Sequence, residues 1–419
     1  MNFLKTSILS GINTLITLIL GLITNKFIAN FIGSEGFAVI GQIKDFMKIT
    51  LSLGQLGFDK GIVKYISTHK NSSKKLSKYI STIFISQLVI SIIIALITIL
   101  FSKQLYYYLT GISHLSKYFI LIGVSILPMV FYTSAMSILN GLHEIKKYTF
   151  ISIAANIVTS GIALILIYNY KLKGVLINLA LIQFINFFVL LLFVIKKPFQ
   201  VSWFKQKFQK NEFKQLSKFS LMSICGTLVL STTLIAIRKY LNSYLGIEYT
   251  GYWEALWRLS AIFITVLTSA FGFYLLPTFS KLYVKHLRKE IFNIWKITLP
   301  ISIIAGILFI FLRDFVINLV YSEEFLVISS LLIFQILGDI IKVNSWILGN
   351  LLLAKVHVKT FIAVQIGWSA LFFLLSVILI QEIGFIGIGV AYLISYIIHF
   401  VFMNIYFRKL LWRKKLIRI

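Results

Sequence analysis

The chain has 419 residues, of which 58% are hydrophobic and only 13% charged, and its formal net charge is +28. A soluble protein of this composition would lack the polar residues needed to cover its surface, so the composition excludes a globular enzyme and indicates a polytopic membrane protein. The positive charge is better explained by anionic lipid and the positive-inside rule than by nucleic acid. A single cysteine, Cys225, excludes an internal disulfide, and the sequence shows no Cys/His cluster for a metal or cofactor.

A membrane-spanning helix needs about 20 consecutive, mostly apolar residues. Twelve stretches of the chain meet this requirement: 7–31, 37–62, 79–101, 117–141, 149–168, 174–195, 217–241, 250–278, 293–312, 328–352, 359–380 and 386–407. The predicted fold class is therefore all-α, a polytopic membrane protein with twelve transmembrane helices in two six-helix bundles.

Lys and Arg are distributed unevenly over the segments between these helices. The segments on one side carry 24 of them, whereas those on the other side carry 4. Because cytoplasmic loops hold the excess of cations, both termini are predicted to be cytoplasmic. The longest cytoplasmic loop, 196–216, suggests a linker between an N-terminal bundle at 1–195 and a C-terminal bundle at 217–407, with a basic cytoplasmic tail at 408–419.

Two short stretches, 26–35 and 239–248, align without a gap and share Lys, Gly and Glu at the same positions. In each copy the motif ends one apolar helix and turns into another helix that carries charge. A repeated hairpin in a membrane chain indicates two related halves with a site for cargo between them.

Four predicted helices carry polar residues at helical spacing, and these helices flank the repeated motif. The stripes are Ser7, Ser10, Thr14, Thr17, Gly21 and Thr24; Lys44, Lys48, Ser52, Gln55 and Asp59; Ser220, Ser223, Thr227, Ser231 and Arg238; and Glu254, Arg258, Thr265, Thr268 or Ser269, and Gly272. Small polar residues in membrane helices usually mediate helix packing, which is the simpler interpretation of the Ser, Thr and Gly positions. The charged positions need a separate explanation.

Charged side chains within the predicted helices point to a binding site. A Lys or Arg near the membrane centre costs at least about 2.5–3.5 kcal/mol, so it normally faces water, a partner or a ligand. We predict that six cations line a water-filled lumen and bind an anionic cargo: Lys26, Lys44, Lys48, Arg238, Lys239 and Arg258. Four acids are predicted to lie in the lumen or to take part in ion coupling: Asp45, Asp59, Glu254 and Asp339.

Two of these acids have a cation at helical spacing. Glu254 and Arg258 are four residues apart, and Asp339 and Lys342 are three apart, so each pair can form on one helix face. If Arg258 is the partner of Glu254, Arg258→Ala alone should cost more than the double change with Glu254→Ala.

Further motifs lie at 216–222, 238–239, 251–253, 273–280, 312–315, 335–339, 342–343 and 354–355, together with Lys26, Gly33 and Lys44. In these positions, and over nearly its whole length, the chain resembles the Wzx-type polysaccharide flippases, which include the lipid III and O-antigen flippases of the MATE-like MOP superfamily. The resemblance implies two six-helix bundles around a V-shaped cavity lined by the four helices with polar stripes. Asp45, directly after Lys44, departs from the family pattern.

The resemblance also implies a function and partners. The expected cargo is an undecaprenyl-diphosphate-linked oligosaccharide, moved by alternating access from the cytoplasmic to the periplasmic leaflet of the bacterial inner membrane. The lipid bilayer and polysaccharide polymerase or assembly proteins are the expected partners. Neither a cofactor nor nucleic acid is expected, and the protein is not predicted to be an enzyme.

Two other functions stay open. A multidrug exporter of the related MATE group would share the fold, but its usually cationic cargo calls for acids in excess. A membrane polysaccharide polymerase or ligase should have a long external loop with catalytic groups. The longest external loops, 102–116 and 313–327, offer only His114 or Arg313 with Asp314. The absence of a GxxxxGK[ST] motif from the sequence argues against ATP hydrolysis.

Overall fold

The computed structural model describes residues 3–113, 115–194, 199–268, 274–275, 278–279, 282–355 and 357–412. Within these ranges the chain forms α-helices and two short 3-10 helices, and it forms no strand. The prediction of an all-α chain is therefore confirmed. By contacts, the chain divides into two compact units, an N-terminal unit at Met1–Ile235 and a C-terminal unit at Ala236–Ile419.

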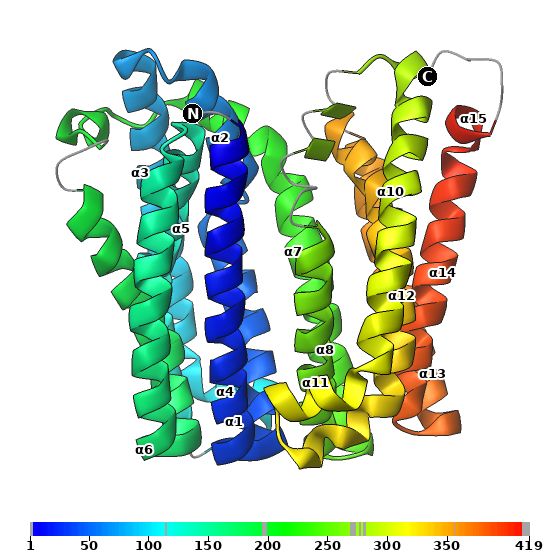
Figure 1. Ribbon diagram of the computed structural model, residues 1–419. Coiled ribbons are helices and arrows are strands. Elements are labelled where there is room, and N and C mark those ends of the chain that lie inside the picture. The colour runs from blue at the N-terminus through cyan, green and yellow to red at the C-terminus, as the bar shows by residue number, and fades with distance from the viewer. Residues whose placement is uncertain are drawn as a thin grey trace. The chain divides into compact units, whose positions relative to one another are not determined.

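The N-terminal unit is built from long helices joined by short turns (Figure 1). Its elements are α1 (Phe3–Gly54), α2 (Asp59–His69), α3 (Ser73–Leu100), α4 (Ser102–Thr110), α5 (Ser116–Gly141), α6 (Ile145–Val194), η1 (Val201–Phe204) and the first part of α7 (Lys210–Tyr244). Within this unit α5 packs against α3 and α6, and α6 packs against α1.

The C-terminal unit runs from green through yellow and orange to red in Figure 1. Its elements are the end of α7, α8 (Ile247–Thr268), α10 (Val284–Phe311), α11 (Arg313–Val320), η2 (Glu323–Ile328), α12 (Ser329–Ala354), α13 (Val358–Ile383), α14 (Ile386–Tyr406) and α15 (Arg408–Leu411). In this unit α12 packs against α8, α10 and α14, so groups on α12 can meet groups from three other helices.

The two units repeat the same series of helices with an offset of 213 residues. Helices α5 and α12 begin at 116 and 329 and end at 141 and 354. The turn glycines Gly33 and Gly246 have this offset, and so do Lys171 inside α6 and Gly384 after α13, and all four have positive φ. The repeat that the sequence predicted from a ten-residue motif therefore extends over most of each unit.

By length and hydropathy, nine helices in the described ranges could cross a membrane. Two of them contain a break in the helical backbone, at Gly33 in α1 and at Lys171 in α6, and each covers two of the predicted spans. α8 is not among the nine, but it is helical over most of the predicted span 250–278, of which 269–273 and 276–277 lie outside the described residues. The count of twelve transmembrane helices stays a prediction.

Large apolar side chains cover the outside of the helices. Leu100, Leu192 and Phe311, at or near the ends of α3, α6 and α10, are all largely exposed. Soluble proteins rarely expose apolar surface on this scale, because water penalises it. This surface is therefore the one that lipid covers, as the composition predicted.

The structure differs from the prediction within the span 37–62. The helix stops before Leu56 and Gly57, which both have positive φ, and α2 then begins at Asp59. A Cβ at position 57 would lie 2.7 Å from the main-chain oxygen of Ser220 in α7, so only glycine leaves room for that helix. The predicted stripe that continued to Asp59 on one helix face is therefore wrong at its end, because Asp59 belongs to a separate helix.

The segment that joins the predicted bundles is held against α3. Trp203 of η1 is buried, and its Nε1 donates to Ser73 Oγ over 3.1 Å. Ser77 and Ser81, one and two turns further along α3, donate to the main-chain oxygens of Ser202 and Trp203 over 3.0 and 2.6 Å. The linker thus packs in the N-terminal unit, and the contact-based division of the chain falls inside α7.

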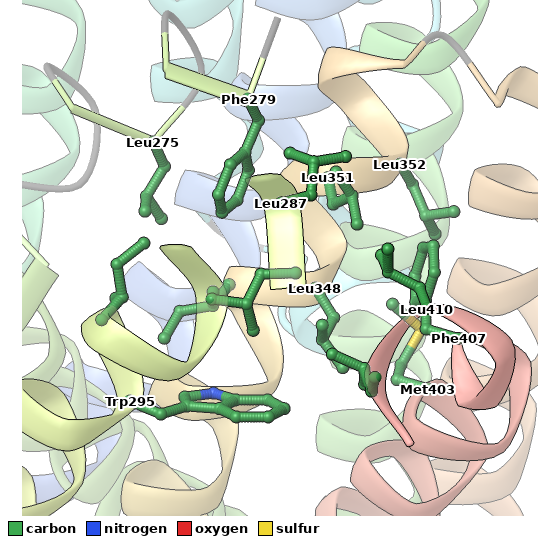
Figure 2. Close-up of a cluster of buried hydrophobic side chains, with 14 of the residues drawn as sticks. Leu275, Phe279, Leu287, Trp295, Leu348, Leu351, Leu352, Met403, Phe407 and Leu410 are labelled. Carbon is green, nitrogen blue, oxygen red and sulfur yellow. The ribbon is translucent and has the colours of Figure 1, made fainter. Parts of the chain in front are cut away.

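A cluster of buried apolar side chains fixes one end of the C-terminal unit (Figure 2). Trp295 of α10, Leu348 of α12 and Met403 of α14 belong to it. Trp295 Nε1 also donates to the main-chain oxygen of Asn344 over 3.1 Å. Close packing of this kind resists local rearrangement. The cluster therefore holds α12 and α14 against each other at this end of the unit.

Candidate functional site

The first charged group lies in the second half of α1 and comprises Lys44, Asp45 and Lys48; we call it the α1 charge group. Asp45 is 1% exposed, and Lys48 Nζ donates to its Oδ1 over 2.8 Å. The Lys48 side chain is 59% exposed, and Lys44 is exposed as well. With two lysines and one carboxylate, the group has a surplus of one positive charge at the surface of the N-terminal unit.

Lys26 and Lys239 occupy equivalent, half-buried places in the two units. Each lies seven residues before the turn glycine of the repeated motif, Gly33 or Gly246. At Gly33 the backbone has φ 72° and ψ −165°, a conformation that residues with a Cβ rarely adopt, so the glycine permits the turn between two helical segments. The motif thus positions one lysine near the turn of each unit.

The second charged group connects α7 and α8 and comprises Arg238, Glu254 and Arg258; we call it the α7–α8 charge group. Arg238 Nη2 donates to Glu254 Oε2 over 2.6 Å, and Arg258 Nε donates to Oε1 over 2.9 Å. Arg238 and Glu254 are buried, with exposures of 1% and 4%. The predicted Glu254–Arg258 pair is confirmed. Two guanidinium groups on one carboxylate again give a surplus of one positive charge.

Aromatic side chains support the α7–α8 charge group. Arg238 Cζ lies 5.4 Å from the ring centroid of Trp253, a cation–π contact. Tyr321 Oη donates to the main-chain oxygen of Ala255 over 2.8 Å, which ties α8 to the segment after α11. The bond to Glu254 and the contact with the Trp253 ring therefore orient the Arg238 guanidinium.

Sequence reasoning missed the contact between Arg238 and Glu254, although the chain contains a signal for it. The two residues lie eight positions before and eight positions after Gly246. In a helical hairpin, residues at equal distances from the turn lie opposite each other. The equivalent positions of the N-terminal unit hold Asn25 and Gly41, so this charged contact belongs to the C-terminal unit alone.

The two remaining acids of the predicted site belong to other networks. Asp59, in the first turn of α2, accepts a hydrogen bond from Ser223 Oγ over 2.7 Å, at a helix end that favours negative charge. Asp339 accepts from Tyr392 Oη over 2.6 Å, and Lys342 Nζ donates to the same hydroxyl over 3.1 Å. The predicted link between Asp339 and Lys342 therefore runs through Tyr392, which the sequence did not indicate.

These groups are suited to binding anions. Lysines act as mobile point charges, and arginines present a planar fork that matches phosphate oxygens. Among the described residues, no three His, Cys, Asp or Glu side chains are grouped so that they could hold a metal ion. Anion binding is therefore the chemistry that the two charge groups support.

A protein-family model described as "Polysaccharide biosynthesis protein" matches residues 3–283. The chain belongs to this family. Its relatives include the lipid III flippases of Escherichia coli (strain K12) and Shigella flexneri, each 25% identical over 422 residues. These matches cover 99% of this chain and 100% of each relative.

Solved structures share the fold of this chain. The lipid II flippase MurJ, in an inward closed conformation, superposes with a TM-score of 0.76 at 19% identity, over 96% of this chain and 87% of that chain. An inward-facing multidrug resistance MATE family transporter of the MOP superfamily gives 0.73 at 15% identity, over 96% and 98%. At these identities the similarity establishes the fold alone, and it confirms the predicted MATE-like fold.

Proposed function

We propose that the protein is a flippase that moves undecaprenyl-diphosphate-linked oligosaccharides from the cytoplasmic to the periplasmic leaflet of the bacterial inner membrane. The family and the similarity to lipid III flippases over the full length of both chains support this class of cargo. The shared fold with a lipid II flippase agrees with it. The proposal requires no covalent chemistry on the cargo.

The observation that carries the proposal is the surplus positive charge of both charge groups within membrane helices. A diphosphate carries about two negative charges, and it cannot enter hydrocarbon unless other polar groups replace its hydration. Cations in a wet groove can do so, while the polyprenyl tail stays in lipid. A cationic drug, the usual cargo of a multidrug exporter, would be repelled by the same groups.

We assign different roles to the cations of the two groups on the basis of their exposure. Lys44 and Lys48 are exposed, and Lys48 keeps 59% of its side chain exposed while it is bonded to Asp45, so we assign these two lysines the first contact with the anion. The Arg258 side chain, 11% exposed, presents a guanidinium oriented by Glu254. Arg238 is fully buried and acts by holding Glu254 in place.

The other predicted residues have secondary roles in this proposal. Lys26 and Lys239, which are half-buried at equivalent places, bind the diphosphate or the first sugar as the cargo passes. Asp59 and Asp339 belong to separate networks and do not contact the cargo.

The proposed membrane arrangement follows from the distribution of cations. Both termini and the linker 196–216 face the cytoplasm, since that side carries 24 Lys and Arg against 4 on the other. Two halves, 1–195 and 217–407, expose the cargo alternately to the two surfaces, and the tail 408–419 stays cytoplasmic. Polysaccharide polymerase and assembly proteins are the proposed partners downstream.

Reconstitution tests this function. The purified chain is placed in liposomes that contain an undecaprenyl-diphosphate-linked oligosaccharide, and the saccharide that becomes accessible to the membrane-impermeant oxidant periodate is measured over time. The chain should speed this transfer well above that of protein-free liposomes. Equal rates in the presence and absence of protein would overturn the proposal.

Charge reversal tests the role of the cations. At about 6 Å and an effective dielectric of 20, one unit charge is worth about 3 kcal/mol, and about 1.4 kcal/mol already changes a rate tenfold. Lys44→Glu should therefore slow transfer at least about tenfold, whereas Lys44→Arg and the exposed control Lys359→Glu should not. If Lys26→Glu, Lys44→Glu and Arg258→Glu all transfer normally, the charge groups do not bind the cargo.

A further inference from the structure

A buried polar row crosses the C-terminal unit between α12 and α14. Lys342 Nζ donates to Tyr392 Oη over 3.1 Å, and Tyr392 Oη donates to Asp339 Oδ1 over 2.6 Å. Asp339 and Tyr392 are fully buried, and Lys342 is 8% exposed. The ammonium and the carboxylate are thus separated by one tyrosine hydroxyl rather than in direct contact.

Four aromatic rings surround the Lys342 ammonium; we call them the aromatic box. They belong to Trp257 of α8, Trp346 of α12, and Tyr392 and Tyr396 of α14. The Nζ atom lies between 5.3 and 5.6 Å from each ring centroid. Ring faces attract cations through their quadrupole, and several rings around one position make a binding site for organic ammonium ions. The chain therefore contains an ammonium site that one of its own side chains occupies.

Two oxygens beside this row lack a hydrogen bond of normal geometry. Asp339 Oδ2 and Gln335 Oε1 are buried and make no such bond within the described part of the chain, although the Ser260 hydroxyl lies near the Asp339 carboxylate. Gln335 Nε2 donates to Ser260 Oγ over 3.0 Å, which fixes the orientation of the amide. Each buried polar atom without a partner costs about 1–3 kcal/mol. A network that served only stability would not retain both of them.

The N-terminal unit shows that the fold does not need these polar groups. Counted with the offset of 213, the equivalents of Gln335, Asp339, Lys342 and Tyr392 are apolar and buried, namely Ile122, Ile126, Met129 and Leu179. Replacing buried ion pairs by apolar residues of similar volume is often neutral or stabilising. The same helix positions therefore pack well without charge in one unit, and the other unit keeps its charges for a different reason.

We propose that the aromatic box is an ammonium-binding site of the transport cycle, with Lys342 as its built-in occupant and Asp339 as the counter-charge. A carboxylate buried in a membrane needs a positive charge nearby, and here a tethered group supplies it. The C-terminal unit therefore keeps its compensating cation through each conformational change and takes up no free cation at this place. The role in transport rests on the proposed flippase function, whereas ammonium binding by the box does not.

Removal of the occupant makes the site testable by binding. Lys342→Ala deletes three methylene groups and the ammonium, which together correspond to n-propylammonium. The purified variant should melt at a higher temperature as n-propylammonium is added, because a ligand that binds only the folded state stabilises it. The uncharged 1-propanol should have no such effect, and n-propylammonium should not shift the wild-type chain, whose box is filled. If n-propylammonium and 1-propanol act alike on Lys342→Ala, the box is not an ammonium site.

The transport assay then asks whether the ammonium is used. With the undecaprenyl-diphosphate-linked probe, Lys342→Ala should lose about tenfold or more in rate, and n-propylammonium should restore most of it. Lys342→Met keeps the length of the side chain without its charge, so it should be slow and should not be restored. Normal transfer by Lys342→Met would overturn the proposed role of the charge.

If Lys342→Ala does not fold, a double variant tests the proposal instead. Asp339→Ile with Lys342→Met copies the residues of the N-terminal unit, so it should melt at or above the wild-type temperature and still transfer the probe about tenfold or more slowly. Transfer at the wild-type rate would show that the cluster is only structural. If the wild-type chain itself does not transfer the probe, the flippase function fails, and the melting experiments alone decide whether the box binds ammonium.

Discussion

Glu254 binds one buried arginine, Arg238, and one partly exposed arginine, Arg258, so mutations in the α7–α8 charge group should have unequal effects. In Arg258→Ala, Arg238 stays bound to Glu254 over 2.6 Å, and a neutral buried pair is left. In the double variant Arg258→Ala with Glu254→Ala, Arg238, which is 1% exposed in the wild-type chain, loses this carboxylate. The double variant should therefore be the less stable of the two. This order is the reverse of the one expected from the Glu254–Arg258 pair alone.

The size of the difference follows from burial. Loss of a hydrogen bond to a charged group costs about 1.5–3 kcal/mol, which is the expected effect of Arg258→Ala. Removal of one partner of a buried ion pair costs about 3–5 kcal/mol, because the other charge stays in a medium that solvates it poorly. We therefore expect the double variant to lie about 1–2 kcal/mol below the single variant in stability.

Thermal unfolding in detergent measures this order. Apparent melting temperatures of the wild type, Arg258→Ala, Glu254→Ala and the double variant are compared at one scan rate, because membrane proteins commonly unfold irreversibly. Lys359→Ala, an exposed cation on α13, is the control and should melt like the wild type. A double variant that melts at or above Arg258→Ala would refute the bridging role of Glu254.

Three further predictions concern the fold and its orientation. Gly57→Ala should destabilise the chain by more than about 1 kcal/mol, because φ is +62° and a Cβ would meet the main chain of α7. The control is Gly349→Ala, whose Cβ would meet nothing within 4 Å, so it should be neutral or stabilise the chain by up to about 1 kcal/mol. Melting temperatures of both variants measure these effects. Trp203→Ala should cost about 3–5 kcal/mol and expose the linker to protease, since the side chain fills a buried site against α3. A cysteine at Lys103 should react with an impermeant thiol reagent in intact cells, while one at Lys207 should react only after permeabilisation; labelling at Lys207 in intact cells would contradict the topology.

Much of the fold could be predicted because lipid imposes a local rule. A spanning helix must satisfy its own backbone hydrogen bonds over about 20 apolar residues, and such runs are visible without knowledge of their neighbours. The turn at Gly33 could also be predicted, because its glycine recurs 213 residues later as Gly246. The break before Asp59 was not visible, because it depends on the close approach of α7 to Gly57, and α7 is distant in sequence.

Charged contacts could be predicted from the sequence where both partners lie on one helix. Glu254 and Arg258 are one helical turn apart, so their spacing alone predicts the pair. The aromatic box was missed because its rings come from three helices, and Trp and Tyr in an apolar helix look like packing residues until an ammonium is found among them. The sequence spacing of two residues predicts a contact on one helix. A contact between two helices can be predicted only from the geometry of a hairpin or seen in the structure itself.

Comparison of equivalent positions in the two repeated units separates residues that the fold needs from charged residues that it does not need. At the equivalent positions 45 and 258 the N-terminal unit has a carboxylate and the C-terminal unit a guanidinium, and each is bonded to a partner of opposite charge. One unit therefore places its surplus charge on exposed lysines, while the other holds cations in buried positions, Arg238 on Glu254 and Lys342 in the aromatic box. Duplication of a scaffold does not explain charges that change sign between copies, because packing constrains both copies alike. The difference agrees with the proposed division of roles, in which exposed lysines of the N-terminal unit would meet the diphosphate while the C-terminal unit would keep its cations fixed among its helices.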